Sequence, residues 1–203
     1  MLGLYNASQA VKTEQANSNR TRRIVLVGFM GAGKSTVGPI LAHRLGWKFV
    51  DGDHYLQAKT GKTISDLFSQ RGEPEFRRLE AEAVAELHQE TELVLALGGG
   101  AIETESTRSL LAQSDDTRLV FLKASLHILI DRCERQEGAV LRPLLQQRET
   151  LGDRFASRLR HYEQAHITVV TENLSPHTVV DRILEQLHED SNSISLIPRV
   201  IAT

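Results

Sequence analysis

Short runs of apolar and β-branched residues recur along the chain, separated by segments in which apolar positions follow a helical spacing. The runs predict five strands, at residues 23–27, 48–50, 93–97, 118–122 and 166–170. The helical spacing predicts helices at residues 34–45, 74–89, 125–135, within 149–165, and at 176–187. Alternation of strands and helices favours an α/β fold, in which helices cover both faces of a parallel sheet.

Two polar segments interrupt this alternation, residues 52–72 and residues 136–148. Long polar insertions in a compact domain more often carry function than merely connect elements. The chain ends also depart from the pattern. Residues 1–22 are rich in Asn, Gln and Ser and predict a disordered tail, and residues 188–203 predict a C-terminal tail, which leaves a single domain at 23–187.

Composition narrows the range of partners. With 24 basic and 26 acidic side chains the formal net charge is −2, so no basic field predicts binding to nucleic acid or to an anionic membrane. No apolar run approaches the roughly 18 residues of a membrane span. Cys133 is the only cysteine, which excludes an internal disulfide and fits a reducing compartment. We therefore expect a cytoplasmic protein, and a monomer.

The strongest motif runs from Gly28 to Ser35, reading GFMGAGKS between a predicted strand and a predicted helix. It matches the phosphate-binding pattern G-x-x-x-x-G-K-[ST], and its context is the one that the pattern requires. Backbone N–H groups of such a loop surround phosphate oxygens, Lys34 reaches the β- and γ-phosphates, and the Ser35 hydroxyl can bind Mg²⁺. The alternative, a chance glycine-rich turn, does not explain the flanking elements.

Two carboxylates follow the second predicted strand, in Asp51-Gly52-Asp53. Parallel sheets bind ligands at the carboxyl ends of their strands. There Asp51 could hold the water shell of a metal, and Asp53 could accept a proton from a substrate hydroxyl. The plain alternative is an Asp-Gly turn with Asp53 capping a helix.

Further candidates lie along the rest of the chain. Arg77 and Glu80 share a helix face, so Glu80 can orient the guanidinium toward a ligand carboxylate, unless the two form only a solvated pair. The residues 98–100 are three glycines after a strand, which suits close approach of backbone to a ligand, although a plain loop is possible. Arg142, in the segment 136–148, could be delivered by a lid to the transferred phosphoryl group; alone it would be a surface arginine.

The strings GFMGAGKST, DGD, GEPEFRRLE, ALGGG and LRPLL, in this order and spacing, resemble the shikimate kinases, over residues 23–187. The resemblance implies a P-loop kinase of the nucleoside monophosphate kinase type. Such a kinase has a five-stranded parallel sheet, a substrate-binding part at about 52–80 and a lid at about 136–148. It also implies transfer of the γ-phosphate of ATP to the 3-hydroxyl of shikimate, in the route to chorismate and the aromatic amino acids.

The resemblance also assigns roles by position. The catalytic group would be Asp53, Lys34 and Arg142, and Mg²⁺ would be held by Ser35 and Asp51. ATP would be bound by Gly31, Ala32, Gly33, Lys34, Ser35, Thr36, Arg132, Arg142 and Pro176. Shikimate would be bound by Asp53, Arg77, Gly98, Gly99, Gly100 and Arg158, the last of which stands four residues before Tyr162 in an R-x-x-x-Y pattern.

Two alternatives stay open from the sequence. The string DGDH also occurs in gluconate kinases, which share the fold, so a sugar acid could be the acceptor. A nucleotide-binding homologue without catalytic activity is the second alternative, although no candidate catalytic position has been replaced.

Overall fold

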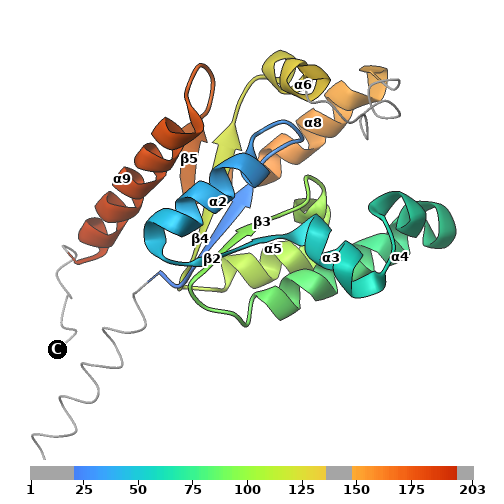
Figure 1. The fold of residues 1–203 in the computed structure, drawn as a ribbon, viewed down its shortest axis with the longest axis horizontal. Coiled ribbons are helices and arrows are strands. Elements are labelled where there is room, and N and C mark those ends of the chain that lie inside the picture. Colours follow the sequence, from blue (N-terminus) through green and yellow to red (C-terminus); the bar gives the residue numbers. More distant parts are fainter. Residues whose placement is uncertain (1–20, 136–147, 196–203) are drawn as a thin grey trace, which may run out of the picture.

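Five parallel strands form the sheet at the centre of the protein (Figure 1). The computed structural model describes residues 21–135 and 148–195. The strands are β1 (Arg23–Val27), β2 (Lys48–Asp51), β3 (Leu93–Ala96), β4 (Thr117–Lys123) and β5 (Ile167–Val170). Their order across the sheet is β2-β3-β1-β4-β5, so the chain goes from β1 to the edge strand β2, returns through β3, and then crosses to β4 and the other edge strand, β5.

The central strand β1 is buried along its whole length because it has neighbours on both edges and helices on both faces. Its Val25 aligns with Leu95 of β3 and Leu119 of β4. A strand covered on both faces has no polar side, which explains the uninterrupted apolar sequence IVLV after Arg23. The core therefore centres on β1, and the loop that follows this strand starts from the buried centre of the fold.

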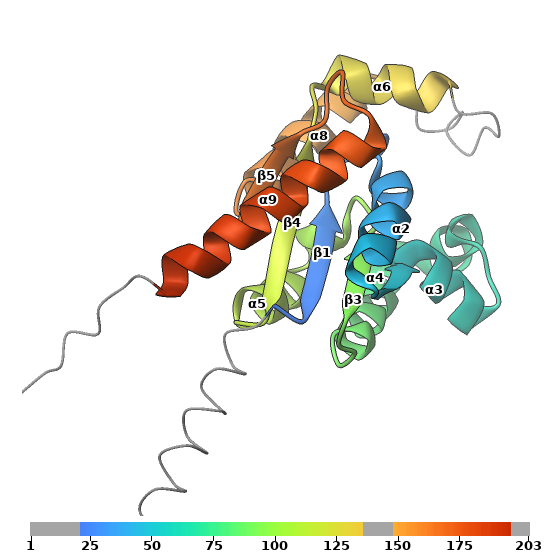
Figure 2. The same cartoon turned by 60° about the vertical axis from the view of Figure 1, so that its left-hand side comes forward.

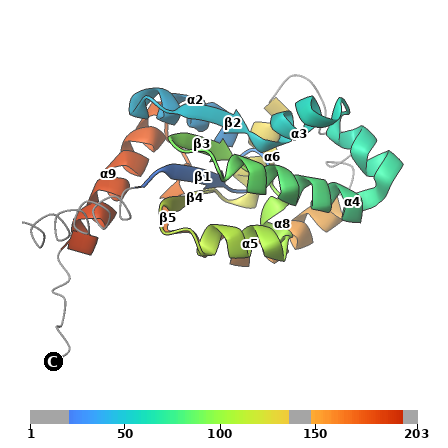
Figure 3. The same ribbon diagram turned by 90° about the horizontal axis from the view of Figure 1, so that it is seen from below.

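Helices cover the two faces of the sheet (Figure 3). The helices α2 (Lys34–Leu45) and α9 (Pro176–Ser195) pack together on one face, with α9 along β5 (Figure 2). The opposite face carries α5 (Glu105–Ala112), α8 (Arg148–Tyr162) and the C-terminal part of α4 (Ile64–Leu87). Three short elements complete this list: α3 (Gly52–Thr60), the 3-10 turn η1 (Ala101–Glu103) and α6 (Leu126–Arg135). Within the described segments, none of these helices has the length and apolarity to cross a bilayer.

The five strands and the fold class predicted from the sequence are confirmed, whereas the polar segment 52–72 differs from expectation. It is helical, forming α3 and the first part of α4. Gly72, with φ 76°, interrupts α4 just before the predicted helix start. The apolar side chains of this region are too few for a clear helical period, but Leu56 and Leu67 form a small second core with Phe76 and Ala83 of the later part of α4. The elements η1 and α5 were also not predicted.

Backbone hydrogen bonding reaches residues at both ends that were predicted from the sequence to lie in the tails. Arg22, assigned to the N-terminal tail, donates its N–H to the Asp116 carbonyl and accepts a hydrogen bond from the N–H of Glu92. At the other end α9 runs to Ser195 instead of ending at residue 187, and Asp190 pairs with Arg118 of β4 at 3.0 Å. The expected lid, including Arg142, lies outside the described residues except for Arg148, which begins α8.

A glycine in the middle of α2 permits the close approach of β2. A methyl group on Gly38 would lie 2.1 Å from the nearest ring carbon of Phe49 in β2. Gly152 in α8 provides a comparison because nothing lies within 4 Å of the methyl group it would carry. The two helical glycines therefore differ in packing, although they share the same backbone cost.

We expect Gly38→Ala to lower the free energy of unfolding by about 1–3 kcal/mol, as overpacking does. Gly152→Ala should raise it by about 0.5–1 kcal/mol, because alanine favours a helix and meets no neighbour. Urea denaturation of both variants measures the difference. Adding Phe49→Leu to Gly38→Ala should recover part of the loss, and equal effects of the two alanines would contradict the packing account.

Candidate active site

The phosphate loop follows β1 at the carboxyl edge of the sheet. Gly31 and Gly33 have φ 74° and 93°, in the left-handed region that L side chains rarely adopt. At Gly31 a methyl group would also lie 2.5 Å from the Leu129 carbonyl oxygen and 2.9 Å from Sγ of Cys133, so α6 packs directly against the loop. Lys34 begins α2, and its ammonium donates to the carbonyls of Gly28 at 2.7 Å and Phe29 at 3.2 Å.

Burial shapes the electrostatics of this lysine. It lowers the pKa of Lys34 to about 8, and the neighbouring Asp53 and Asp51 carboxylates only partly offset this effect. The ammonium has no carboxylate partner in the described part of the chain at ion-pair distance, and bonds instead to neutral carbonyls. A bound polyphosphate would supply the missing negative charge, so the position of Lys34 suits phosphate binding.

Asp51 links the phosphate loop to the substrate side of the site. Its Oδ2 accepts a hydrogen bond from the Ser35 hydroxyl at 2.7 Å. Its Oδ1 accepts from the N–H groups of Asp53 at 3.1 Å and His54 at 3.3 Å, which makes Asp51 the N-cap of α3. The plain alternative from the sequence placed this cap at Asp53. Because β2 continues through Asp51 and α3 begins at Gly52, the cap lies two residues earlier than that alternative placed it. The side chain of Asp53 therefore does not cap the helix.

Asp53 lies in the first turn of α3, with its carboxylate against the glycine segment after β3. A methyl group on Gly98 would lie 2.6 Å from Oδ1 of Asp53 and 2.8 Å from Oε1 of Glu80. Burial raises the pKa of Asp53, and the charge of Asp51 raises it further, although Lys34 lowers it. A carboxylate with a raised pKa is a better proton acceptor than a free aspartate at neutral pH.

Arg77 extends from the second part of α4 toward the same glycines. Its Nη1 donates to the buried Glu80 carboxylate at 2.7 Å, and its guanidinium lies 5.1 Å from the Phe76 ring centroid. A methyl group on Gly100 would lie 2.3 Å from Nη2 of Arg77. The pair is therefore not merely solvated, since the Glu80 side chain is only 8% exposed and that of Arg77 18%. Because they have no side chains, Gly98 leaves room for Asp53 and Glu80, and Gly100 leaves room for Arg77.

Arg158, on α8, reaches the site from the opposite side. Its guanidinium lies over the ring of Phe29, 5.7 Å from the centroid, and its Nη1 is 3.7 Å from the position of a methyl group on Gly99. Tyr162, one turn later, donates its hydroxyl hydrogen to the Gly99 carbonyl. The R-x-x-x-Y pattern thus places one residue in the site and uses the other to hold the glycine backbone.

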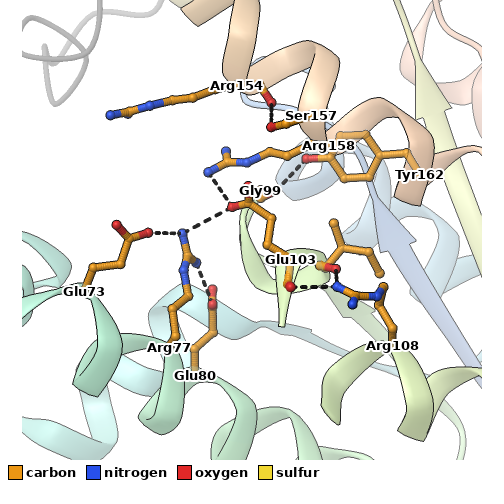
Figure 4. A network of polar contacts seen from close by, with 11 residues as sticks. Glu73, Arg77, Glu80, Gly99, Glu103, Arg108, Arg154, Ser157, Arg158 and Tyr162 are labelled. Carbon is orange, nitrogen blue, oxygen red and sulfur yellow. Dashed lines mark hydrogen bonds and ion pairs between the residues drawn. The ribbon is translucent and has the colours of Figure 1, made fainter. Parts of the chain in front are cut away.

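A carboxylate that the sequence did not single out joins the two arginines (Figure 4). Glu103, at the end of η1, has its Oε2 2.9 Å from Nη2 of Arg158 and 3.6 Å from Nη2 of Arg77. Arg108 donates hydrogen bonds to the main-chain carbonyls of Ile102 and Glu103 and so fixes η1, the 3-10 turn that carries Glu103. No linear signal marks Glu103, because its position depends on a 3-10 turn and on helices far away in the sequence.

A separate cavity of about 340 Å³ opens on the other side of the phosphate loop. Arg132 lies in it and is held by Thr171, whose hydroxyl and carbonyl accept hydrogen bonds at 3.0 Å and 2.7 Å. Leu174 and Val179 give it an apolar wall, which suits a flat ring. Several predicted ATP-binding residues line this cavity, namely Gly31, Ala32, Gly33, Thr36, Arg132 and Pro176.

The structure therefore brings the predicted residues together in two adjoining regions. Lys34, Ser35, Asp51 and Asp53 lie between the cavity and the two arginines. In the described segments no group of three or more His, Cys, Asp or Glu side chains could enclose a metal. A hydroxyl and a carboxylate 2.7 Å apart, as in Ser35 and Asp51, fit Mg²⁺ instead, because this ion takes few protein ligands and completes its shell with water and phosphate oxygens.

Comparisons with known proteins agree with this geometry. The family model for shikimate kinase matches residues 30–188. The chain is 37% identical over 168 residues to the shikimate kinase of Persephonella marina, covering 82% of this chain and 99% of that one. It is 41% identical over 170 residues to that of Symbiobacterium thermophilum, covering 82% and 96%.

Solved structures extend the comparison. The shikimate kinase of Acinetobacter baumannii, in complex with shikimate, superposes with a TM-score of 0.74 at 35% identity, over 86% of this chain and 97% of that one. A gluconokinase from Sinorhizobium meliloti superposes with a TM-score of 0.54 at 19% identity, over 87% and 96%, a likeness that concerns the fold alone.

The sheet order and the lysine-bearing loop after the central strand define a P-loop kinase fold of the nucleoside monophosphate kinase type. Within that class the chain belongs to the shikimate kinase family. The resemblance carried by the five sequence strings is thus confirmed.

Nucleotide binding should take up a proton above neutral pH, because Lys34 has a pKa of about 8 in the free protein and bound phosphates favour its charged form. Below about pH 7 Lys34 is already protonated, so its ionisation should no longer change the ATP affinity. Above about pH 8 affinity should fall by up to about tenfold per pH unit. Calorimetry at about pH 8.5 in buffers of different ionisation enthalpy measures the proton uptake.

Lys34→Arg is the matched control, since a guanidinium stays charged over this range. Its nucleotide affinity, whatever its absolute value, should show little pH dependence. Nucleotide binding by the unchanged protein without proton uptake would contradict the role of Lys34.

Proposed function

We propose that the protein transfers the γ-phosphate of ATP to the 3-hydroxyl of shikimate, giving shikimate 3-phosphate and ADP, in the route to chorismate and the aromatic amino acids. The observation that carries the proposal is the pair of guanidiniums, Arg77 and Arg158, that converge beside Asp53 and the phosphate loop. The acceptor thus needs a carboxylate for the arginines and, a short distance away, a hydroxyl for Asp53. Shikimate has both on one rigid ring.

On the nucleotide side, the residues of the chain bind ATP and orient it. The apolar wall of the cavity receives the adenine, and the N–H groups of the phosphate loop and α2 surround the phosphates. Lys34 leaves the carbonyls of Gly28 and Phe29 and reaches the β- and γ-phosphates. Ser35 and Asp51 would hold Mg²⁺, which when bound neutralises charge that develops on the phosphates. Arg142 would add a positive charge from the lid.

On the acceptor side Asp53 accepts the proton of the 3-hydroxyl while that oxygen forms its bond to the γ-phosphorus, and the bond from phosphorus to the β-phosphate oxygen breaks. Its raised pKa makes the carboxylate basic enough to accept the proton. Gly99 lies between Arg158 and the phosphate loop: a methyl group on Gly99 would lie 3.7 Å from Nη1 of Arg158 and 3.8 Å from the Gly28 carbonyl oxygen. A ring whose carboxylate is bound by the arginines would therefore lie next to the phosphate loop.

The two alternatives differ from this proposal in what the site must hold. A flexible sugar acid such as gluconate does not need two fixed arginines beside a base at one short separation, so the geometry favours a rigid ring. A protein without catalytic activity has no need of an aspartate whose pKa is raised at the mouth of a phosphate loop. The monomeric state and the cytoplasmic location stay predictions of the sequence.

The first test is ADP release in a coupled assay with ATP and Mg²⁺, in which shikimate, gluconate or no acceptor is added. We expect turnover with shikimate, at a rate at least about a hundredfold above the other two, because only shikimate satisfies the arginines and Asp53 together. Turnover with gluconate alone would favour the sugar acid kinase, and absence of turnover in all three would favour the silent homologue.

Asp53→Asn should lower kcat by about a hundredfold to ten-thousandfold and leave ATP affinity within about twofold, because the amide keeps the shape but cannot accept the proton. In the unchanged enzyme, activity should fall as the pH drops through the raised pKa of Asp53, since protonation removes the base. Initial rates and nucleotide titrations measure both effects. Asp115→Asn, an exposed change just before β4, is the control and should alter neither.

A further inference from the structure

We propose that the carboxylate of Glu103 occupies the place of the substrate carboxylate between Arg77 and Arg158, and that shikimate binds by displacing it. Glu103 would then be a specificity-determining residue, which sets the affinity for the acceptor and requires the acceptor to bring a carboxylate of its own. The inference rests on the proposed function, because it concerns the acceptor side of the same site.

The geometry is that of an internal ligand. One oxygen of Glu103, Oε2, contacts Nη2 of both arginines, at 2.9 Å for Arg158 and 3.6 Å for Arg77 (Figure 4). Nη2 is the donor that Arg77 leaves for a substrate carboxylate, since its Nη1 is already bound to Glu80. A second carboxylate cannot use the same N–H groups while Glu103 remains, and like charges at this distance repel.

The two arginines are held by other groups. Glu80 holds Arg77 from below at 2.7 Å, and the rings of Phe76 and Phe68 lie 5.1 and 6.0 Å from its guanidinium. Arg158 lies over Phe29. Because these contacts do not involve Glu103, the guanidiniums keep their positions when its carboxylate leaves. The contribution of Glu103 is thus competition more than orientation.

Glu103 can leave without a change of fold. Its side chain is 34% exposed, against 13% for Arg158 and 18% for Arg77. Its backbone is fixed separately, by the hydrogen bond from its N–H to the Gly100 carbonyl and by Arg108, which donates to the carbonyls of Ile102 and Glu103. Rotation of one partly exposed side chain into water is therefore sufficient to free the two Nη2 groups.

Glu73 provides a matched control on the same cluster. Its carboxylate also contacts Nη2 of Arg77, at 3.3 Å, but has no ion pair with Arg158 among the described residues, and its side chain is 63% exposed. Replacing it removes the same charge from the same neighbourhood without vacating the place between the arginines. A general electrostatic effect would appear in both variants, and a competitive effect only in Glu103→Gln.

The experiment is calorimetric titration of the full chain with shikimate, followed by steady-state kinetics. We expect Glu103→Gln to tighten shikimate binding and to lower the KM for shikimate, and not that for ATP, by about two- to fivefold, as release of one partly exposed ion pair allows. Glu73→Gln should change the shikimate affinity by less than about 1.5-fold. Thermal melting should show Glu103→Gln to be less stable without shikimate, since the arginines lose a partner.

The outcomes separate the inference from the function on which it rests. No shikimate binding by the unchanged protein overturns the proposed function, and the inference with it. Shikimate binding that is unchanged or weaker in Glu103→Gln overturns the inference alone, because it would mean that Glu103 orients the arginines for the substrate. Glu103→Ala repeats the test without an amide that could hydrogen bond in the same place, and must change affinity in the same direction.

Discussion

A single carboxylate, that of Asp51, connects the parts on which the site depends. One oxygen accepts the hydroxyl hydrogen of Ser35 at the start of α2, and the other caps α3 through the N–H groups of Asp53 and His54. The phosphate loop, the edge strand β2 and the first helix of the substrate side are thereby held in one frame. Because Asp51 caps α3, the carboxylate of Asp53 is not needed for that cap and stays available for the proton transfer proposed above. The spacing between the phosphate loop and α3 is thus set by hydrogen bonds to this one residue.

Three positively charged side chains in partly buried positions also organise the site. Lys34, Arg77 and Arg158 face a common region, and each has an interim acceptor from the protein: carbonyls for Lys34, Glu80 and Glu103 for Arg77, and Glu103 for Arg158. Burying such charges without partners would cost several kcal/mol. In the proposed mechanism, phosphate and carboxylate oxygens of the substrates replace these acceptors, and the charges that folding has already desolvated then contribute to binding affinity.

Sequence reasoning reached the features that local chemistry dictates. The loop from Gly28 to Lys34 is recognisable because its glycines and lysine have fixed tasks along a continuous backbone. Arg77 and Glu80 are recognisable from their helical spacing. Glu103 was not predicted as a site residue because it contacts the arginines only when α4, α8 and η1 have assembled. Phe29 was not predicted because it stands at a variable position of the loop motif, although its ring supports Arg158. The helices in 52–72 were not predicted because only a few of their residues are apolar, and these pack into a small second core instead of the main one.

Gly98 and Gly100 restrict how this site can evolve. At position 98 a side chain would require Asp53 and Glu80 to shift, and at position 100 it would require Arg77 to shift. Either substitution would therefore move a side chain of the proposed acceptor site or displace the loop itself. Gly99, whose added methyl group meets its nearest neighbour at 3.7 Å, carries no such steric restriction from the protein itself. New acceptors are therefore more readily accommodated by changes around Gly99 than by changes in the glycines on either side.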